Sequence, residues 1–168
     1  DDAPEALRFA TIAAGIGEGL EEQLTNFLTQ HPDTSLVVID TLQRIRTGSD
    51  SGNPYANDYR DIGALKALAD KHRIAILLIH HVRKLRSDDP MDMISGTTGI
   101  SGATDSNFVL KERRRGSGEA TLYCTGRDIE YRELPLVFDK SGYTWRLTEP
   151  VEGERTSIDP EAISLSVF

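Results

Sequence analysis

The chain has 168 residues, of which 38% are hydrophobic and 27% charged, a balance typical of one soluble globular domain or most of one. Its formal net charge of −8 argues against a protein that coats nucleic acid through overall positive charge. No apolar run is long enough to span a membrane and no signal-peptide pattern opens the sequence, so we expect a cytoplasmic protein. Cys124 is the only cysteine, which excludes an intrachain disulfide and fits a reducing compartment.

The beginning of the sequence combines an apolar stretch, a glycine-rich stretch and an amphipathic one. Residues 7–12, Leu-Arg-Phe-Ala-Thr-Ile, predict a short strand, and the glycine-rich residues 15–19 predict a loop. Residues 20–30 predict a helix that ends at His31-Pro32, because the residue before a proline is disfavoured in a helix. The apolar positions of this helix recur at helical spacing and are Leu20, Leu24, Phe27 and Leu28.

Two aliphatic runs flank a long amphipathic segment. Residues 36–39 and 74–79 are typical of strands buried on both faces of a parallel sheet. Residues 57–72 predict a helix, capped by Asn57 or a neighbour, after a surface loop over residues 47–54. The apolar face of this helix comprises Tyr59, Ile62, Leu65 and Leu68 or Ala69. Strand, helix and strand at this spacing predict a βαβ unit with parallel strands and a right-handed crossover.

The pattern becomes more polar after the second aliphatic run. Residues 83–93 predict a loop, because they are polar and poorly periodic. Residues 96–105 are small and polar and predict a turn with a short helix. A strand over residues 107–111 is expected to follow.

The last part of the sequence is typical of antiparallel strands. Residues 121–125 alternate in polarity, and residues 134–138 and 143–147 flank the turn sequence Asp-Lys-Ser-Gly at 139–142. Pro135 indicates that its strand is an edge strand, or that the proline is the first strand residue. A parallel core extended by antiparallel strands therefore places the chain in the α/β class.

Asp40 directly follows the first aliphatic run. In open α/β sheets ligands bind at the carboxyl ends of the strands, so Asp40 stands where chemistry is usually done. A carboxylate there can hold Mg²⁺, directly or through water, beside nucleotide phosphates. An aspartate that caps a turn or helix is the alternative. No Gly-x-x-x-x-Gly-Lys-Ser/Thr loop occurs in the sequence, and residues 15–19 lack the lysine of a phosphate loop.

His80 and His81 follow the second aliphatic run and would lie at the same sheet edge as Asp40. A hydrogen-bonding side chain there can respond to a γ-phosphate and pass the signal to the following loop. A core histidine bonded to backbone is the alternative for His80. A zinc site is disfavoured, because His-Glu-x-x-His and a cysteine partner are absent, although a cluster of Asp40 with the two histidines stays open. A serine hydrolase is excluded by the absence of Gly-x-Ser-x-Gly.

Two clusters of basic residues interrupt this acidic chain. One comprises Arg83, Lys84 and Arg86, and the other comprises Lys111 with Arg113, Arg114 and Arg115. Such runs are usually solvated loop charge. A contact with nucleic acid is the alternative for each cluster.

Taken together, these segments resemble the RecA-like ATPases, and most closely the plasmid- and phage-borne group related to the RepA and DnaB hexameric helicases. The resemblance extends from residue 36 to residue 138 and implies a RecA-like fold, with a mostly parallel sheet flanked by helices and extended by C-terminal antiparallel strands. It rests on the long helix and on Leu36–Thr41, Leu77–Lys84, Gly96–Asp105 and Thr125–Asp128, which occur in the matching order.

The resemblance implies a role for each matching residue at the nucleotide. Asp40 matches the Walker B acid that binds Mg²⁺. His81 matches the sensor position at the tip of the next strand, and His80 stands beside it. Arg127 matches an arginine finger, which would reach the nucleotide of the neighbouring subunit and neutralise charge in the transition state.

The resemblance also leaves alternatives for the arginines. Arg132 is a second candidate for the finger. A plain surface ion pair of Arg127 with Asp128 or Glu130 is the alternative to a catalytic role. For DNA, the resemblance implies phosphate contacts from a channel-facing loop, through Arg83, Lys84 and Arg86.

As a whole, the resemblance implies ATP and Mg²⁺ as cofactors, single-stranded DNA as a partner and a homohexamer. The family's Walker A loop and catalytic glutamate have no counterpart here. We therefore expect residues 1–148 to form the C-terminal part of a RecA-like ATPase domain that is inactive by itself, and residues 149–168 to be a polar tail or the start of a following segment. A non-catalytic RecA-fold module for oligomerisation or for DNA or protein binding is the second hypothesis. A hydrolase or metal enzyme that uses Asp40 with His80 and His81 is the third.

Overall fold

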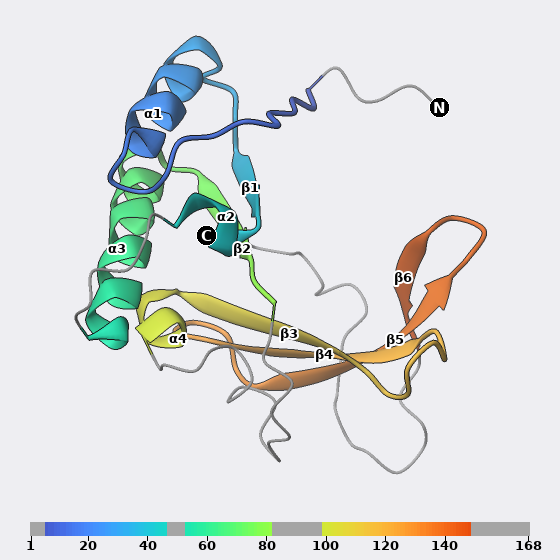
Figure 1. The fold of residues 1–168 in the computed structure, drawn as a ribbon. Coiled ribbons are helices and arrows are strands. Elements are labelled where there is room, and N and C mark those ends of the chain that lie inside the picture. Colours follow the sequence, from blue (N-terminus) through green and yellow to red (C-terminus); the bar gives the residue numbers. More distant parts are fainter. Residues whose placement is uncertain (1–5, 47–52, 82–98, 149–168) are drawn as a thin grey trace. The chain divides into compact units, whose positions relative to one another are not determined.

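The computed structural model describes residues 6–46, 53–81 and 99–148, which are coloured in Figure 1. They divide into two compact units, one ending at His80 and the other beginning at His81, and each unit is described by itself. Among the described residues, no helix is long and apolar enough to cross a membrane. The predicted loop over residues 83–93 and the predicted tail over residues 149–168 lie outside the described residues.

The first unit contains α1 (Leu20–Gln30), β1 (Leu36–Asp40), α2 (Leu42–Ile45), α3 (Pro54–His72) and β2 (Ala75–Ile79). Strands β1 and β2 pair in parallel, with Leu36 opposite Ala75 and Asp40 opposite Ile79. This pairing confirms the predicted βαβ unit, since α3 returns the chain so that both strands start at the same edge of the sheet.

Helices α1 and α3 lie on one side of the β1–β2 sheet, as Figure 1 shows. Leu28 of α1 and Leu68 of α3 form a buried cluster with Ile74, and Val37 and Ile76 pack against it from the strands. Burial of one such aliphatic side chain stabilises the fold by about 1.5–3 kcal/mol. The apolar stripe that predicted α1 is therefore the surface that holds the helix to the sheet.

The opposite face of this two-stranded sheet carries Leu36, Val38, Leu77 and Ile79, which are between 37% and 51% exposed. The prediction of strands buried on both faces is therefore wrong for the described part of the chain. Successive side chains of a strand point to opposite faces, and of the open face only the small Ala75, at the start of β2, is buried. An aliphatic run indicates a strand, but it does not say how many of its faces are covered.

Residues 7–12 do not form the predicted strand. Phe9 is 83% exposed and Ile12 is 86% exposed. A strand requires a partner that takes up its backbone N–H and C=O groups, and no described strand pairs with this segment. The apolar residue types of this segment were not sufficient for a strand.

Helix α3 begins at Pro54, three residues earlier than predicted. Asn53 is the capping residue, and its side chain accepts the Tyr55 N–H at 3.0 Å. The first turns of the helix bury a different face from the predicted one. Tyr59, predicted to face the core, is 53% exposed, whereas Asp58 is buried. Further along, the predicted core positions Ile62, Leu65 and Leu68 are buried, as expected.

The second unit contains α4 (Gly99–Ala103), β3 (Ser106–Glu112), β4 (Glu119–Gly126), β5 (Arg132–Asp139) and β6 (Thr144–Leu147). The strands form one antiparallel sheet in the order β3-β4-β5-β6, with every neighbour joined by a short connection. This confirms the predicted C-terminal antiparallel strands and the turn between residues 139 and 142. The two units together give a mixed α/β fold, with a parallel pair in one and an antiparallel sheet in the other.

Pro135 lies in β5, which has a neighbour on both sides, so the expectation of an edge strand or of a first strand residue is wrong. The Pro135 carbonyl accepts the Thr148 N–H at 3.0 Å, just past the end of β6. In an antiparallel ladder the N–H and C=O of one residue point to the same side. The N–H that proline lacks would therefore face the end of β6, where the β5–β6 ladder has already ended at Leu136.

Candidate functional site

Asp40 is the last residue of β1 and is exposed to solvent. Because it is paired in register with Ile79, the last residue of β2, the two parallel strands end side by side. Both carboxyl ends therefore lie at one edge of the sheet, which is where ligands bind in open α/β sheets. The first unit thus presents an exposed carboxylate at the position predicted from the sequence.

An exposed single carboxylate suits Mg²⁺ better than it suits a transition metal. Within residues 6–46, 53–81 and 99–148, no group of three or more His, Cys, Asp and Glu side chains comes together to hold a metal. Mg²⁺ needs no such cage, since it keeps several waters and is usually held by one or two carboxylates and substrate phosphates. Asp40 is therefore the described residue that could hold the ion, which would neutralise charge on a bound phosphate.

The segment after Asp40 is held rigidly by packing. Thr41 is the N-cap residue of the four-residue helix α2, whose Leu42 is fully buried and whose Ile45 is 5% exposed. The Ile45 carbonyl accepts the N–H of Ile16 at 2.8 Å, and Ile16 is itself buried. The chain is thus anchored within five residues of the carboxylate, and this anchoring limits the positions that Asp40 can take.

A cluster of charges just beyond α2 gives a second anchor, which was not predicted from the sequence. Arg46 Nη2 lies 2.6 Å from Asp58 Oδ1, and Arg46 Nε lies 3.8 Å from Asp61 Oδ2. All three side chains are largely buried. Removing one partner of this ion pair therefore costs more free energy of folding than removing one partner of a surface pair. The available signal was the i, i+3 spacing of Asp58 and Asp61, at the inward-facing start of a helix.

The two histidines that follow β2 fall in different surroundings. His80 is half-buried and is the last residue of the first unit, next to the end of β2. His81 is exposed and is the first residue of the second unit. Within the first unit, Asp40 and His80 belong to the same edge, because β1 and β2 end in register.

Arg127 follows the last residue of β4 and is 65% exposed at its side chain. Its guanidinium Nη1 lies 3.3 Å from Asp105 Oδ1, and its N–H donates to the Asp105 carbonyl at 2.8 Å. An ion pair does occur, but its partner is Asp105 and not Asp128 or Glu130. The pairing with Asp105 arises because β3 and β4 are antiparallel, so the residue before β3 meets the residue after β4.

Gly126 explains how Arg127 comes so close to Asp105. A Cβ atom at this glycine would lie 2.6 Å from the Asp105 carbonyl oxygen and 2.9 Å from Ser106 Oγ. Only glycine allows the two backbones to approach this closely. Arg127 therefore stands on a fixed backbone, while its exposed guanidinium forms a surface ion pair with Asp105. Such a pair is worth about 0–1 kcal/mol.

Arg132, the second candidate for an arginine finger, begins β5 and is exposed. It lies opposite Cys124 on β4. Burial raises the pKa of the Cys124 thiol, and the nearby Arg132 charge partly opposes this. Cys124 is therefore a buried neutral thiol. The candidate DNA contacts Arg83, Lys84 and Arg86 lie outside the described residues.

Comparison with known proteins supports one part of this picture. Residues 10–87 match the model of a protein family described as an AAA domain. The match spans α1, β1, α2, α3 and β2, and so it includes the edge that carries Asp40. No curated protein matches the chain. The match supports an ATPase-type, nucleotide-binding module of the AAA or RecA-like kind in this part of the chain.

Proposed function

We propose that the chain is part of a RecA-like ATPase of the RepA and DnaB helicase type, which acts on DNA in the replication of a plasmid, phage or mobile element. The observation that carries this proposal is Asp40, an exposed carboxylate at the shared carboxyl edge of two parallel strands, inside the segment that matches an AAA domain. In the proposed assembly, subunits of a cytoplasmic homohexamer share each nucleotide site.

The proposal assigns one step to each residue. Asp40 holds Mg²⁺ on the ATP phosphates, His80 contacts the nucleotide, and His81 responds to the γ-phosphate. Arg127 acts on the nucleotide of the neighbouring subunit. Its 65% exposed guanidinium and its weak ion pair support this role, because the side chain can leave Asp105 at little cost. Single-stranded DNA binds the loop that carries Arg83, Lys84 and Arg86.

The test is ATP hydrolysis by the full polypeptide that the gene encodes. We expect Asp40→Asn to reduce turnover by about 100-fold or more, because the ion then lacks its protein ligand. Asp33→Asn is the matched control, since Asp33 is an exposed carboxylate in the turn before β1. Equal activity of wild type and Asp40→Asn, or no hydrolysis by wild type with DNA present, would contradict the proposal and favour the non-catalytic module.

The shared site has its own test. We expect Arg127→Ala to lower turnover by roughly 10³-fold while nucleotide binding is retained. Arg60→Ala is a close control, because Arg60 is 66% exposed and has an acidic partner, Asp61, at 3.6 Å. In mixed assemblies, Arg127→Ala subunits should restore activity to Asp40→Asn subunits, since each supplies what the other lacks. Failure of this complementation would show that Arg127 does not act across subunits.

A further inference from the structure

Two tight turns lie at the same end of the four-stranded sheet in the second unit. Strands β3 and β5 both pair antiparallel with β4, so they run in the same direction. The turn that follows β3 and the turn that follows β5 therefore lie at the same end of the sheet. The β3–β4 turn comprises residues 113–118, and the β5–β6 turn comprises residues 140–143. Figure 1 shows both turns at the end of the sheet opposite to α4.

The β3–β4 turn is strongly basic. Four of the chain's 19 lysine and arginine residues stand among the five residues 111–115, and all four are exposed. Arg113 lies 3.9 Å from Glu119. In the described part of the chain, no acidic side chain forms an ion pair with Lys111, Arg114 or Arg115.

The acidic residues at this end are already engaged. Glu112 accepts the Gly116 N–H at 3.4 Å, and Glu119 faces Arg113. Asp139 lies 2.9 Å from Arg146 Nη2 and also accepts hydrogen bonds from Ser141. Over residues 111–119 the four cations outnumber the two carboxylates, so the β3–β4 turn carries a local net positive charge on an acidic protein.

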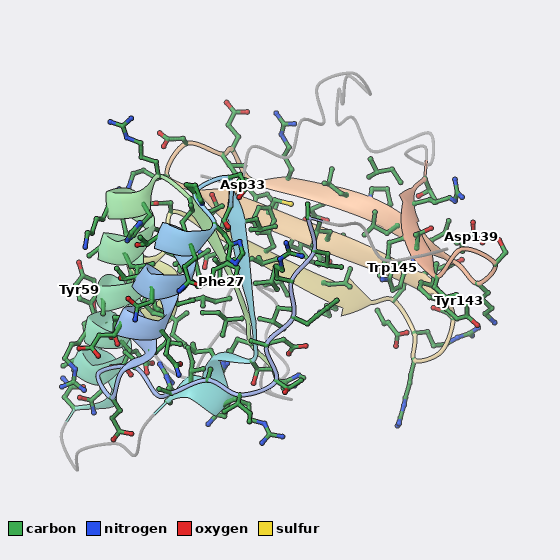
Figure 2. All side chains as sticks on the ribbon, turned by 90° about the horizontal axis from the view of Figure 1, so that it is seen from above. Phe27, Asp33, Tyr59, Asp139, Tyr143 and Trp145 are labelled. Carbon is green, nitrogen blue, oxygen red and sulfur yellow. The ribbon has the colours of Figure 1, made fainter. Side chains whose placement is uncertain are left out.

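Two exposed aromatic side chains stand at the same end. Trp145 of β6 packs against Phe138 of β5, with ring centroids 5.1 Å apart and an interplanar angle of 59°. Tyr143, in the β5–β6 turn, is 82% exposed. Figure 2 shows Tyr143 and Trp145 close to Asp139 at the tip of this hairpin.

A backbone hydrogen bond joins the β3–β4 turn to Phe138, the residue against which Trp145 packs. The Gly118 carbonyl accepts the Phe138 N–H at 2.7 Å, so the last residue of the basic turn is one strand away from Phe138 and two strands away from Trp145. Because neighbouring strands lie about 4.8 Å apart, Gly118 and Trp145 are separated by roughly 10 Å. A short ligand can therefore span the distance between the backbone of the β3–β4 turn and Trp145.

We propose that this end of the sheet binds single-stranded nucleic acid, with phosphates on Arg114 and Arg115 of the β3–β4 turn and bases stacked on Trp145 and Tyr143. Binding of single strands typically combines a basic track for the backbone with aromatic rings for the bases. Arginine suits this task, because its planar fork matches the oxygens of a phosphate. The choice of single-stranded nucleic acid as the ligand rests on the proposed ATPase function. The residues of this site are different from those assigned to ATP hydrolysis.

Trp145 provides a direct test, because it is the only tryptophan of the chain. We expect oligothymidylate to quench its fluorescence at low salt, without any nucleotide or Mg²⁺. Inorganic polyphosphate, which has charge but no bases, should compete without quenching. Absence of quenching by oligothymidylate would overturn the proposal, whereas the ATPase proposal would be untouched by it.

Paired variants separate the clustered charge from the total charge. Removing two phosphate contacts with Arg114→Gln/Arg115→Gln should reduce the slope of log affinity against log salt by about 1.4. The control Arg44→Gln/Lys71→Gln removes two exposed charges from the first unit and should leave the slope unchanged. Equal effects of the two pairs would overturn the proposal, because bulk charge would then explain binding.

A variant in the β5–β6 turn tests stacking. Tyr143 has a φ of 51°, a left-handed conformation that asparagine tolerates, so Tyr143→Asn should keep the turn intact. We expect it to weaken oligothymidylate binding about tenfold while the competing polyphosphate binds as before. Unchanged oligothymidylate affinity would remove Tyr143 from the site. Binding to phosphatidylglycerol vesicles without quenching by oligothymidylate would overturn the proposal in favour of a membrane surface.

Discussion

In the first unit β1 and β2 run parallel because α3 carries the chain back between them, whereas in the second unit each strand from β3 to β6 is joined to the next by a short connection. The carboxyl ends of parallel strands share one edge, so Asp40 and the residue after β2 come together there. In the antiparallel sheet, neighbouring turns alternate between the two ends. Residues that are distant in sequence therefore meet at each end.

This difference separates the candidate functions within the second unit. Arg127 and Asp105 lie where β3 begins and β4 ends. The β3–β4 turn with its arginines and the β5–β6 turn with Tyr143 lie at the other end, where β3 and β5 end. The candidate arginine finger and the proposed nucleic-acid site thus occupy opposite ends of one sheet. In the first unit, by contrast, one edge carries all the candidate chemistry.

The largest expected effect concerns the helix-covered core of the first unit. Leu65 of α3 is 1% exposed, so Leu65→Ala should lower the free energy of unfolding by about 3 kcal/mol, through lost burial and a cavity. Leu36→Ala is the matched control, because Leu36 is 46% exposed and its truncation should cost less than about 1 kcal/mol. Chemical unfolding followed by circular dichroism measures both. Similar losses would mean that the open face of the β1–β2 sheet is covered in solution.

A smaller effect is expected from the charge cluster that anchors α2. Removing Arg46 takes the cation at 2.6 Å away from the largely buried Asp58, so Arg46→Ala should cost about 2–3 kcal/mol. Arg60→Ala removes an exposed arginine 3.6 Å from the same helix's Asp61 and should cost less than about 0.5 kcal/mol. A double-mutant cycle with Asp58→Ala isolates the pair. A coupling energy near zero would show that Arg46 stabilises the unit only through its alkyl chain.

The close approach in the second unit gives the next test. Gly126→Ala would place a Cβ 2.6 Å from the Asp105 carbonyl oxygen, so we expect a loss of about 1–3 kcal/mol from local displacement of β3 and β4. Gly102→Ala in α4 meets nothing within 4 Å and should be neutral or stabilising by about 0.5 kcal/mol. Unfolding followed by Trp145 fluorescence compares them. If the two variants are equally stable, the backbones near Asp105 are free to separate.

The smallest effect is a pH dependence confined to the β5–β6 turn. Hydrogen bonds from the Ser141 hydroxyl and N–H, followed by one from Arg146, lower the pKa of Asp139 to about 2, from an ordinary 3.8. A lowered pKa favours the folded turn above about pH 4, and that contribution is lost as the pH falls towards 2. We expect Trp145 fluorescence to change over this range in wild type and not in Asp139→Asn. The same change in Asp139→Asn would assign it to another group.

Most secondary structure could be predicted because it depends on local pattern. The spacing of Leu20, Leu24 and Leu28 predicted α1 with its observed bounds, and the aliphatic runs predicted β1 and β2. The turn at residues 139–142 was predicted from its residue types. The prediction for residues 7–12 was wrong, since an apolar stretch forms a strand only when it has a partner strand, and no described strand pairs with it.

The sequence by itself determined the βαβ unit, the antiparallel sheet and the position of Asp40 at a strand end, because these follow from periodicity and turn chemistry between near neighbours. Only the tertiary structure decided that Arg127 pairs with Asp105, that Arg46 joins α2 to α3, and which face of the β1–β2 sheet is covered. It likewise brought the arginines of the β3–β4 turn to the same end of the sheet as Trp145. Such contacts join residues that are far apart in the chain. Their formation depends on strand register and packing, which cannot be predicted from a local sequence pattern.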